Sequence, residues 1–253
     1  MSKPHFSKEF WVAALRAEGA AFRTAAGQQD ALALSVPSCP EWTVEDLARH
    51  LGVLYRWVAG HVGRGVTSRP DPPDHDEAPT GTAVLSWWDE RYAELLKALD
   101  WLDPALPAWN WAPQTKKAEF WHRRMAHETA VHRWDAQMAV GLGERIEAKL
   151  AADGITEVLD TWLPAGRRCG PLDRHGVVAL RATDVAAAWA VRLRGRGIAL
   201  LDTDTLLDHD SHHERTVAAG TASDLLLALY GRVPFDVLDV AGDESLLEAL
   251  RTG

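Results

Sequence analysis

One short segment of the sequence, residues 127–135, spaces imidazole and carboxylate side chains in a way suited to binding a metal ion. Glu128 and His132 are four residues apart and Asp135 follows three residues later, so on an α-helix they share one face. A carboxylate and an imidazole that point inward are costly to bury unless they are paired, and a divalent cation bound by both removes most of that cost. The segment therefore predicts a metal site.

The histidine spacing differs from the zinc-protease pattern His-Glu-x-x-His. His127 and His132 are five residues apart. They therefore diverge by about 140° around a helix, which makes Glu128 a better ligand candidate than His127. His50 is a third candidate, and with Glu128 and His132 it would leave coordination positions open, as catalytic zinc requires. Taken alone, His50 is more simply a histidine hydrogen-bonded within a helix bundle, and the alternative for Glu128 with His132 is an exposed pair.

Four long segments with apolar residues at helical spacing are expected to position these side chains, at 6–26, 43–61, 82–102 and 117–140. Thr43 is predicted to be the N-cap of the second helix, with Glu45 and Asp46 favourably placed in its first turn. The segment 36–42 is predicted to be a loop, because each proline biases the preceding residue to extended geometry. Four helices with irregular connections predict a bundle whose sites are built from inward-facing side chains.

The character of the sequence changes near residue 143. Beyond it, apolar patterning predicts helices at 148–163, 222–230 and 244–250, and strands at 176–182, 189–193, 198–202, 215–219 and 235–240. Strands mixed with helices in this way indicate an α+β domain. The predicted fold class is therefore α+β with two domains, 1–142 and 143–253.

Composition narrows the classes of function. The chain has 253 residues, of which 47% are hydrophobic, and a net charge of −9, so it can form a core but lacks the basic face that nucleic-acid binding requires. No window approaches the roughly 18 uncharged apolar residues of a membrane span. The two cysteines predict no disulfide framework, which agrees with a reducing compartment. We expect a cytoplasmic protein that is a monomer or a homodimer.

Three motifs together resemble one family. They are C-P-x-W-T-V followed by H-L-G within residues 39–52, R-M-x-H-E-x-x-x-H-R-x-D-A at 124–136, and G-T-A-S-D-L-L-L-A-L-Y-G-R at 220–232. The combination resembles the mycothiol-dependent maleylpyruvate isomerase family of actinobacterial enzymes. This resemblance implies an N-terminal four-helix bundle of the DinB type that carries a divalent metal, usually zinc, on His, Glu and His. The matching positions here are His50, Glu128 and His132.

The resemblance also implies a sterol-carrier-like α+β C-terminal domain whose Leu-x-Gly-Arg arginine faces the metal cleft, and Arg232 occupies that position. A helix cap or a surface ion pair is the simpler alternative for Arg232. The implied cosubstrate is mycothiol, a low-molecular-weight thiol whose thiolate a zinc ion would stabilise.

Three functions are open at the level of sequence. In isomerisation the thiolate would add to a cis double bond of an unsaturated acid, the resulting single bond would rotate, and elimination would give the trans product. In S-transfer the adduct with a small electrophile would be released instead. The third alternative is a small-molecule carrier or sensor without catalysis, in which the metal is structural or absent.

Weaker candidates surround the expected ligands. Arg124 and Asp135 are candidate cofactor-binding residues, although Arg124 is more often a structural partner in such a place and Asp135 either orients His132 or pairs with an arginine. Cys39 is more simply a small buried cysteine than a reactive thiol. The polar segment 209–214 is rich in histidine and acidic residues, for which solvation or adventitious metal binding is the simpler explanation.

Overall fold

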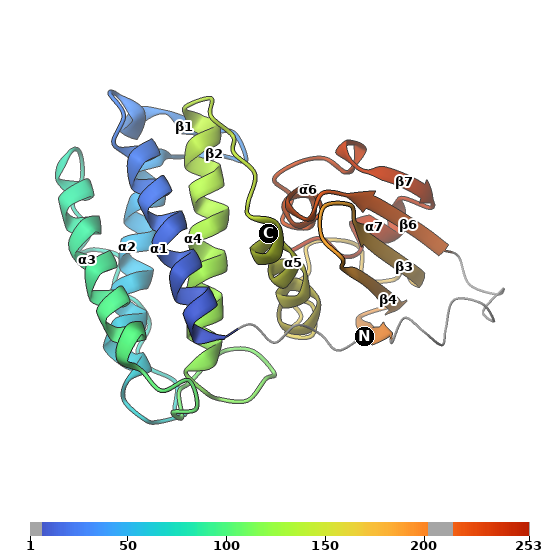
Figure 1. Ribbon diagram of the computed structural model, residues 1–253, viewed down its shortest axis with the longest axis horizontal. Coiled ribbons are helices and arrows are strands. Elements are labelled where there is room, and N and C mark those ends of the chain that lie inside the picture. The colour runs from blue at the N-terminus through green and yellow to red at the C-terminus, as the bar shows by residue number, and fades with distance from the viewer. Residues whose placement is uncertain (1–6, 202–214, 253) are drawn as a thin grey trace. The chain divides into compact units, whose positions relative to one another are not determined.

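The computed structural model describes residues 7–201 and 215–252, and the chain divides into two compact units. One unit holds the described residues up to 111 and from 115 to 144. The other holds the described residues from 145 onward, together with 112–114. The first unit is helical and the second contains a sheet, which confirms the predicted α+β class with two domains (Figure 1).

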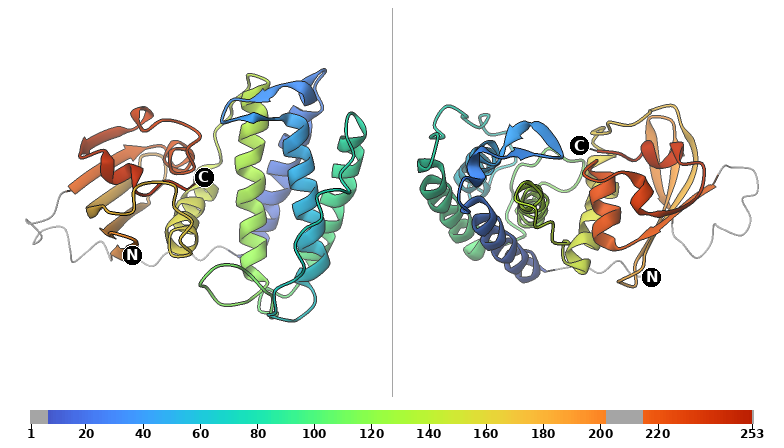
Figure 2. Two further views of the ribbon diagram at one scale, coloured as in Figure 1. Left: turned by 180° about the vertical axis from the view of Figure 1, so that it is seen from behind. Right: turned by 90° about the horizontal axis from the view of Figure 1, so that it is seen from above.

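Within its described residues, the first unit is a bundle of four long helices: α1 (Lys8–Ala26), α2 (Val44–Val62), α3 (Ala83–Trp101) and α4 (Glu119–Ala139). α4 packs against α1 and α2, and α3 packs against the same two helices from the other side (Figure 2). The side chains that fill the space between them are large and fully buried, among them Leu15, Phe22, Leu47, Leu51, Tyr55, Trp88, Leu95, Trp121 and Met125. The four predicted helices are confirmed, apart from residue 6, which lies outside the described residues.

The start of α2 is fixed by a reciprocal pair of hydrogen bonds. The Asp46 backbone N–H donates to Thr43 Oγ1 over 3.3 Å, and the Thr43 backbone N–H donates to Asp46 Oδ2 over 2.9 Å. This capping box satisfies two backbone donors that a helix leaves unpaired at its first turn, and a cap of this kind typically contributes about 1 kcal/mol. The predicted N-cap is therefore confirmed, and the positions of later α2 residues follow from it.

The predicted loop at 36–42 is wrong, because the segment forms a β-hairpin. β1 (Ser35–Val36) pairs antiparallel with β2 (Cys39–Thr43), with Val36 opposite Cys39 across the turn. The prolines do favour extended backbone, as expected, and an extended segment can pair when each proline sits in a turn or on an edge strand where no N–H is needed. β1 packs against α4 and β2 against α2, so the hairpin covers one end of both helices.

In the described part of the second unit, five strands form a mixed sheet in the order β5-β4-β3-β6-β7. Their bounds are β3 (His175–Ala182), β4 (Ala188–Arg194), β5 (Gly197–Leu201), β6 (Arg215–Gly220) and β7 (Asp239–Gly242). β3 and β6 are parallel and the other neighbours are antiparallel. The helices are α5 (Ala148–Glu157), α6 (Ala222–Leu229) and α7 (Ser245–Glu248), and α6 and α7 both pack on β3.

Two predictions in this unit need correction, and two others fall on residues that the structure does not describe. The strand expected at 235–240 begins with a 3-10 turn, η3 (Phe235–Val237), and pairing starts only at Asp239, because Phe235 turns into the core beneath the guanidinium of Arg251. The helix expected at 148–163 ends as an α-helix at Glu157 and continues as a π-helical turn, η2 (Val158–Trp162), closed by the Leu163 N–H on the carbonyl of Val158. Residue 202 and the segment 209–214 lie outside the described residues.

None of the described helices combines the length and the apolar character that crossing a membrane requires.

A buried ion pair joins α1 to α4. Arg133 Nε donates to Glu18 Oε2 over 2.6 Å, and both side chains are almost fully buried. Arg133 Nη1 also donates to Gln137 Oε1 and to the carbonyl oxygen of Glu144, so the same guanidinium secures the chain where it leaves α4.

This buried ion pair should contribute measurably to the stability of the bundle. Removing one member of a buried pair leaves the other charge uncompensated, so we expect Glu18→Ala to lower the free energy of unfolding by about 3 kcal/mol. The exposed pair between Arg23 and Asp89 joins α1 to α3 and provides a matched control. For Asp89→Ala we expect a loss of roughly 0–1 kcal/mol. Urea denaturation followed by tryptophan fluorescence measures the free energy of unfolding of both variants. Equal losses in the two variants would contradict the larger contribution expected of the buried pair.

Candidate metal centre

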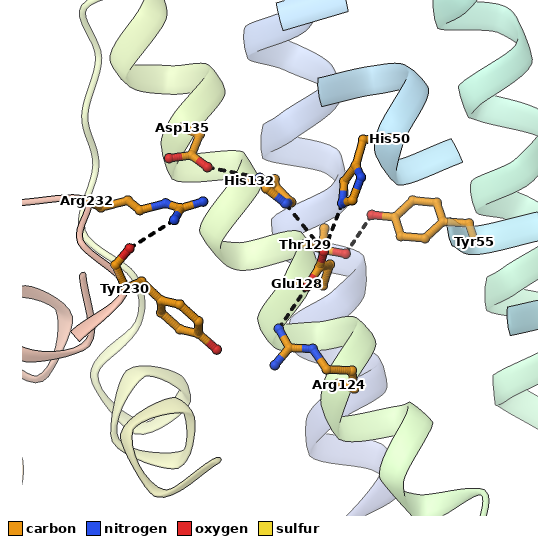
Figure 3. A network of polar contacts seen from close by, with 9 residues as sticks. All are labelled: His50, Tyr55, Arg124, Glu128, Thr129, His132, Asp135, Tyr230 and Arg232. Carbon is orange, nitrogen blue, oxygen red and sulfur yellow. Dashed lines mark hydrogen bonds and ion pairs between the residues drawn. The ribbon is translucent and has the colours of Figure 1, made fainter. Parts of the chain in front are cut away.

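The helical unit brings His50, Glu128 and His132 to one point (Figure 3). His50 comes from α2, whereas Glu128 and His132 lie one turn apart on α4. His50 Nε2 is 3.0 Å from Glu128 Oε1, and His132 Nε2 is 3.4 Å from the same oxygen. One ligand atom from each residue lies within 4.8 Å of the other two.

The donor set and its burial suit a divalent cation. The side chains of His50, Glu128 and His132 are 30%, 17% and 10% exposed, so the cluster lies near the surface of the bundle without being open to solvent on all sides. Two imidazole nitrogens and a carboxylate oxygen are donors typical of zinc, and three protein ligands leave a coordination position for a further molecule. Within residues 7–201 and 215–252 no other group of histidine, cysteine and acidic side chains converges in this way.

The electrostatics of the cluster favour an ionised carboxylate. Burial acts to raise the pKa of Glu128, but hydrogen bonds from His132 and His50 and the charge of Arg124 outweigh it and hold the pKa well below its usual range. Burial likewise acts to lower the pKa of His132, yet the neighbouring carboxylates of Asp135 and Glu128 raise it to about 9. A proton on His132 Nε2, the ring nitrogen that faces Glu128, would therefore have to leave when a cation binds to that nitrogen.

Arg124 lies one helical turn before Glu128 on α4. Its Nη2 donates to Glu128 Oε2 over 3.1 Å, and its side chain is nearly fully buried. The guanidinium therefore engages one carboxylate oxygen while the other faces the two imidazoles. The contact matches the structural alternative considered for Arg124, and a contact with cofactor or substrate stays a prediction.

Asp135 lies against His132 on the side away from Glu128. The His132 Nδ1–H donates to Asp135 Oδ2 over 2.9 Å, and the Asp135 side chain is fully buried. A hydrogen bond at Nδ1 fixes the tautomer that leaves Nε2 available to a metal ion. Of the two alternatives for Asp135, the structure therefore shows the contact that the orienting role requires.

Sequence reasoning missed several neighbours of the cluster. The Trp42 ring, carried by β2, lies 5.2 Å from the His50 ring and 6.4 Å from the His132 ring, measured between ring centroids. Tyr55 Oη lies 2.6 Å from Thr129 Oγ1 and so joins α2 to α4 beside the ligands. Trp42 and Thr129 each fall inside one of the sequence motifs, but nothing in the motif indicates which way their side chains face.

Other candidates are not part of the three-residue cluster. His127 is fully buried and does not belong to the cluster, as its spacing predicted. Cys39, on β2, and Cys169 are both free thiols. Arg232 follows α6 in the second unit, where its Nη1 donates to the carbonyl oxygen of Tyr230 over 2.9 Å.

The helix end before Arg232 has the geometry of a Schellman motif. Gly231 has a φ of +69°, its N–H donates to the carbonyl of Ala228, and the Arg232 N–H donates to the carbonyl of Leu227. Glycine is suited to this position because a left-handed backbone conformation strains other residues. The motif gives the Arg232 backbone a fixed position, while its role in binding or catalysis stays a prediction.

The fold and the site together define a two-domain protein in which a helix bundle carries a candidate His-Glu-His metal site and is followed by an α+β domain. Residues 12–137 match the mycothiol maleylpyruvate isomerase N-terminal domain, and residues 149–249 match the C-terminal domain of the same family. These two matches cover most of the chain. The protein therefore belongs to the mycothiol maleylpyruvate isomerase family, as the motifs indicated.

Two solved structures share this fold. The crystal structure of the mycothiol-dependent maleylpyruvate isomerase is 13% identical in sequence and superposes with a TM-score of 0.64 over 95% of this chain and 96% of that chain. A histidine-to-alanine mutant of the mycothiol-dependent maleylpyruvate isomerase gives a TM-score of 0.62 with the same identity and coverage. No curated protein matches the sequence.

Metal analysis of purified variants tests the ligand set. We expect the wild-type protein to hold about one divalent ion, and His50→Ala and Glu128→Ala to lose most of it, because each change removes a donor from a three-residue set. His75 lies exposed in the connection before α3, so His75→Ala serves as a matched histidine control and should retain the ion. Full metal occupancy in both ligand variants would show that the ion is held elsewhere.

Proposed function

We propose that the protein is a metal-dependent isomerase that uses mycothiol to convert a cis unsaturated acid such as maleylpyruvate into its trans isomer. The convergence of His50, Glu128 and His132 in a chain of this family carries the proposal. Zinc is the proposed metal because nitrogen and carboxylate donors suit it. A cytoplasmic location is part of the proposal and is supported by the two free cysteines, which fit a reducing compartment.

Three residues of the site would bind the ion, and two others would hold these ligands in place. His50, Glu128 and His132 supply the donor atoms, Arg124 engages the second oxygen of Glu128, and Asp135 holds the outer nitrogen of His132. A bound divalent cation would supply Lewis-acid stabilisation of the thiolate form of the thiol, which is its nucleophilic form. The partial burial of the cluster would limit the access of water.

The proposed reaction regenerates the thiol. The thiolate sulfur adds to one carbon of the cis double bond, which forms a C–S bond and moves the electron pair onto the conjugated carbonyl as an enolate. The former double bond is now single and rotates. Collapse of the enolate expels the thiolate and restores the double bond in its trans form, so the sum of the steps consumes no thiol. If the enolate instead takes up a proton from solvent at carbon and the saturated thioether is released, the outcome is S-transfer, which product analysis distinguishes.

Arg232 is the proposed carboxylate-binding residue. A guanidinium presents a planar fork of donors that matches a carboxylate with two parallel hydrogen bonds, and a lysine in its place keeps the charge but loses that fit. The Schellman motif at the end of α6 supports the proposal because it fixes the backbone from which the side chain extends.

Turnover should require an added thiol rather than a thiol of the protein. We expect Cys39→Ser to convert maleylpyruvate at the wild-type rate with saturating mycothiol, and neither protein to act without it. Cys169→Ser is a matched control, because Cys169 is the other free cysteine and is exposed. Loss of activity in Cys39→Ser alone, despite saturating mycothiol, would indicate that Cys39 is the nucleophile instead of mycothiol.

Replacing Arg232 by lysine tests its role in binding substrate. We expect kcat/KM to fall by roughly tenfold, about 1.4 kcal/mol of transition-state stabilisation, while metal content and melting temperature stay near wild type. Arg145 is an exposed arginine of the same unit that lies 3.7 Å from Asp224 on α6, so Arg145→Lys provides the control. Unchanged kinetics in a folded Arg232→Lys protein would contradict the proposed role of Arg232 in binding substrate.

A further inference from the structure

We propose that the β1–β2 hairpin is a positioning element of the metal centre, in which Ser38 acts on the ligand His132 through Asp135. The inference rests on the proposed metal-binding function of the cluster and extends it to a segment outside the bundle helices. Ser38 lies in the turn between the two strands, directly before Cys39. It is not one of the residues that the sequence analysis singled out.

A continuous chain of hydrogen bonds connects the hairpin to the ligand. Ser38 Oγ donates to Asp135 Oδ1 over 2.6 Å, and Asp135 Oδ2 accepts from His132 Nδ1 over 2.9 Å. The two oxygens of one carboxylate are thus held from opposite ends, so the carboxylate cannot rotate without breaking one of the two bonds. Hydrogen bonds to an ionised acceptor are short and about twice as strong as neutral ones.

The direction of each hydrogen bond follows from the chemistry of the groups. An ionised carboxylate can only accept, so the Ser38 hydroxyl must donate its proton to Asp135 and the His132 Nδ1 must carry a hydrogen. The other ring nitrogen of His132 is then the one that faces Glu128, which is where a cation would bind. Because Asp135 is fully buried, its orientation depends on protein partners rather than on solvent.

Independent contacts hold the hairpin against the site. Trp42, on β2, packs its ring against both His50 and His132. The side chain of Val36, on β1, is fully buried. Thr43 ends the hairpin and at the same time caps α2, so the chain is fixed just after Trp42. Ser38 therefore extends from a segment that is anchored on either side of it.

The contact from Ser38 has two possible consequences, which differ in what they change. If the hydroxyl served only to dock the hairpin, its removal would lower stability and leave the metal affinity of the folded protein unchanged. If it positions His132 through Asp135, its removal lowers metal affinity without a matching loss of stability. Residues that orient a metal ligand in this way typically contribute about 10–100-fold to affinity.

The test measures zinc affinity of the full-length protein by competition with a chelator, together with the melting temperature of the metal-free form. We expect Ser38→Ala to bind zinc about tenfold more weakly than wild type, and Ser38→Thr, which keeps a hydroxyl, to recover most of the loss. Ser35→Ala is the matched control, because Ser35 is an exposed serine of the same hairpin. Ser35→Ala should bind zinc as wild type does.

A double-mutant cycle with Asp135→Ala tests the path of the effect. If Ser38 acts through Asp135, adding Ser38→Ala to Asp135→Ala should weaken zinc binding by less than twofold, because removal of the carboxylate already breaks the link. Wild-type affinity in Ser38→Ala, an equal loss in Ser35→Ala, or a full additive loss in the double mutant would each overturn the inference while the metal site itself stands. A wild-type protein that binds no zinc would overturn both proposals.

Discussion

The structure depends on one costly arrangement, a mostly buried carboxylate that lies between two imidazoles on the helix bundle. Glu128 is tolerated there because the three side chains that engage its oxygens carry or can carry positive charge: Arg124 engages one oxygen, and His50 and His132 share the other. Desolvation of a lone carboxylate would otherwise be compensated by protonation. The bundle must therefore hold α2 and α4 in register, and the Thr43 capping box and the bond between Tyr55 and Thr129 serve that requirement.

α4 is the element on which these requirements converge. It is buried along most of its length although it carries arginines, histidines and acidic residues, so apolar packing alone does not account for its burial. Its polar groups are instead satisfied in two directions. One face carries Glu128, His132 and Asp135 toward the metal centre, and Arg133 points to Glu18 on α1. The helix is thus secured by specific pairs, which is consistent with a site that needs fixed donor positions.

Much of this arrangement could be predicted from the sequence, and the limits have physical causes. Helical periodicity predicted the bundle helices, and the spacing of Glu128 and His132 identified two of the three candidate ligands, because both depend on contacts within a few residues. His50 needed the family resemblance, since only packing between helices brings it to the others. The β1–β2 hairpin was not predicted, because prolines indicate extended backbone but carry no information about its pairing partner. The contact between Ser38 and Asp135 joins residues 97 apart in the sequence, so local patterns could not predict it. The 3-10 turn at Phe235 could not be predicted either, because it depends on how the Phe235 side chain packs in the core.

Asp135 has two opposing effects on His132: it orients the imidazole for metal binding, and it favours the protonated imidazole that cannot bind a metal through Nε2. Its carboxylate fixes the His132 tautomer and makes the imidazole more basic, which strengthens the bond that Nε2 can form with a cation. The same basicity raises the pKa of His132 to about 9, so in the absence of an ion a proton competes for that nitrogen at neutral pH. An ion must therefore interact with the cluster strongly enough to displace this proton. Glu128, whose pKa is held low, remains an ionised donor throughout and offsets part of that cost.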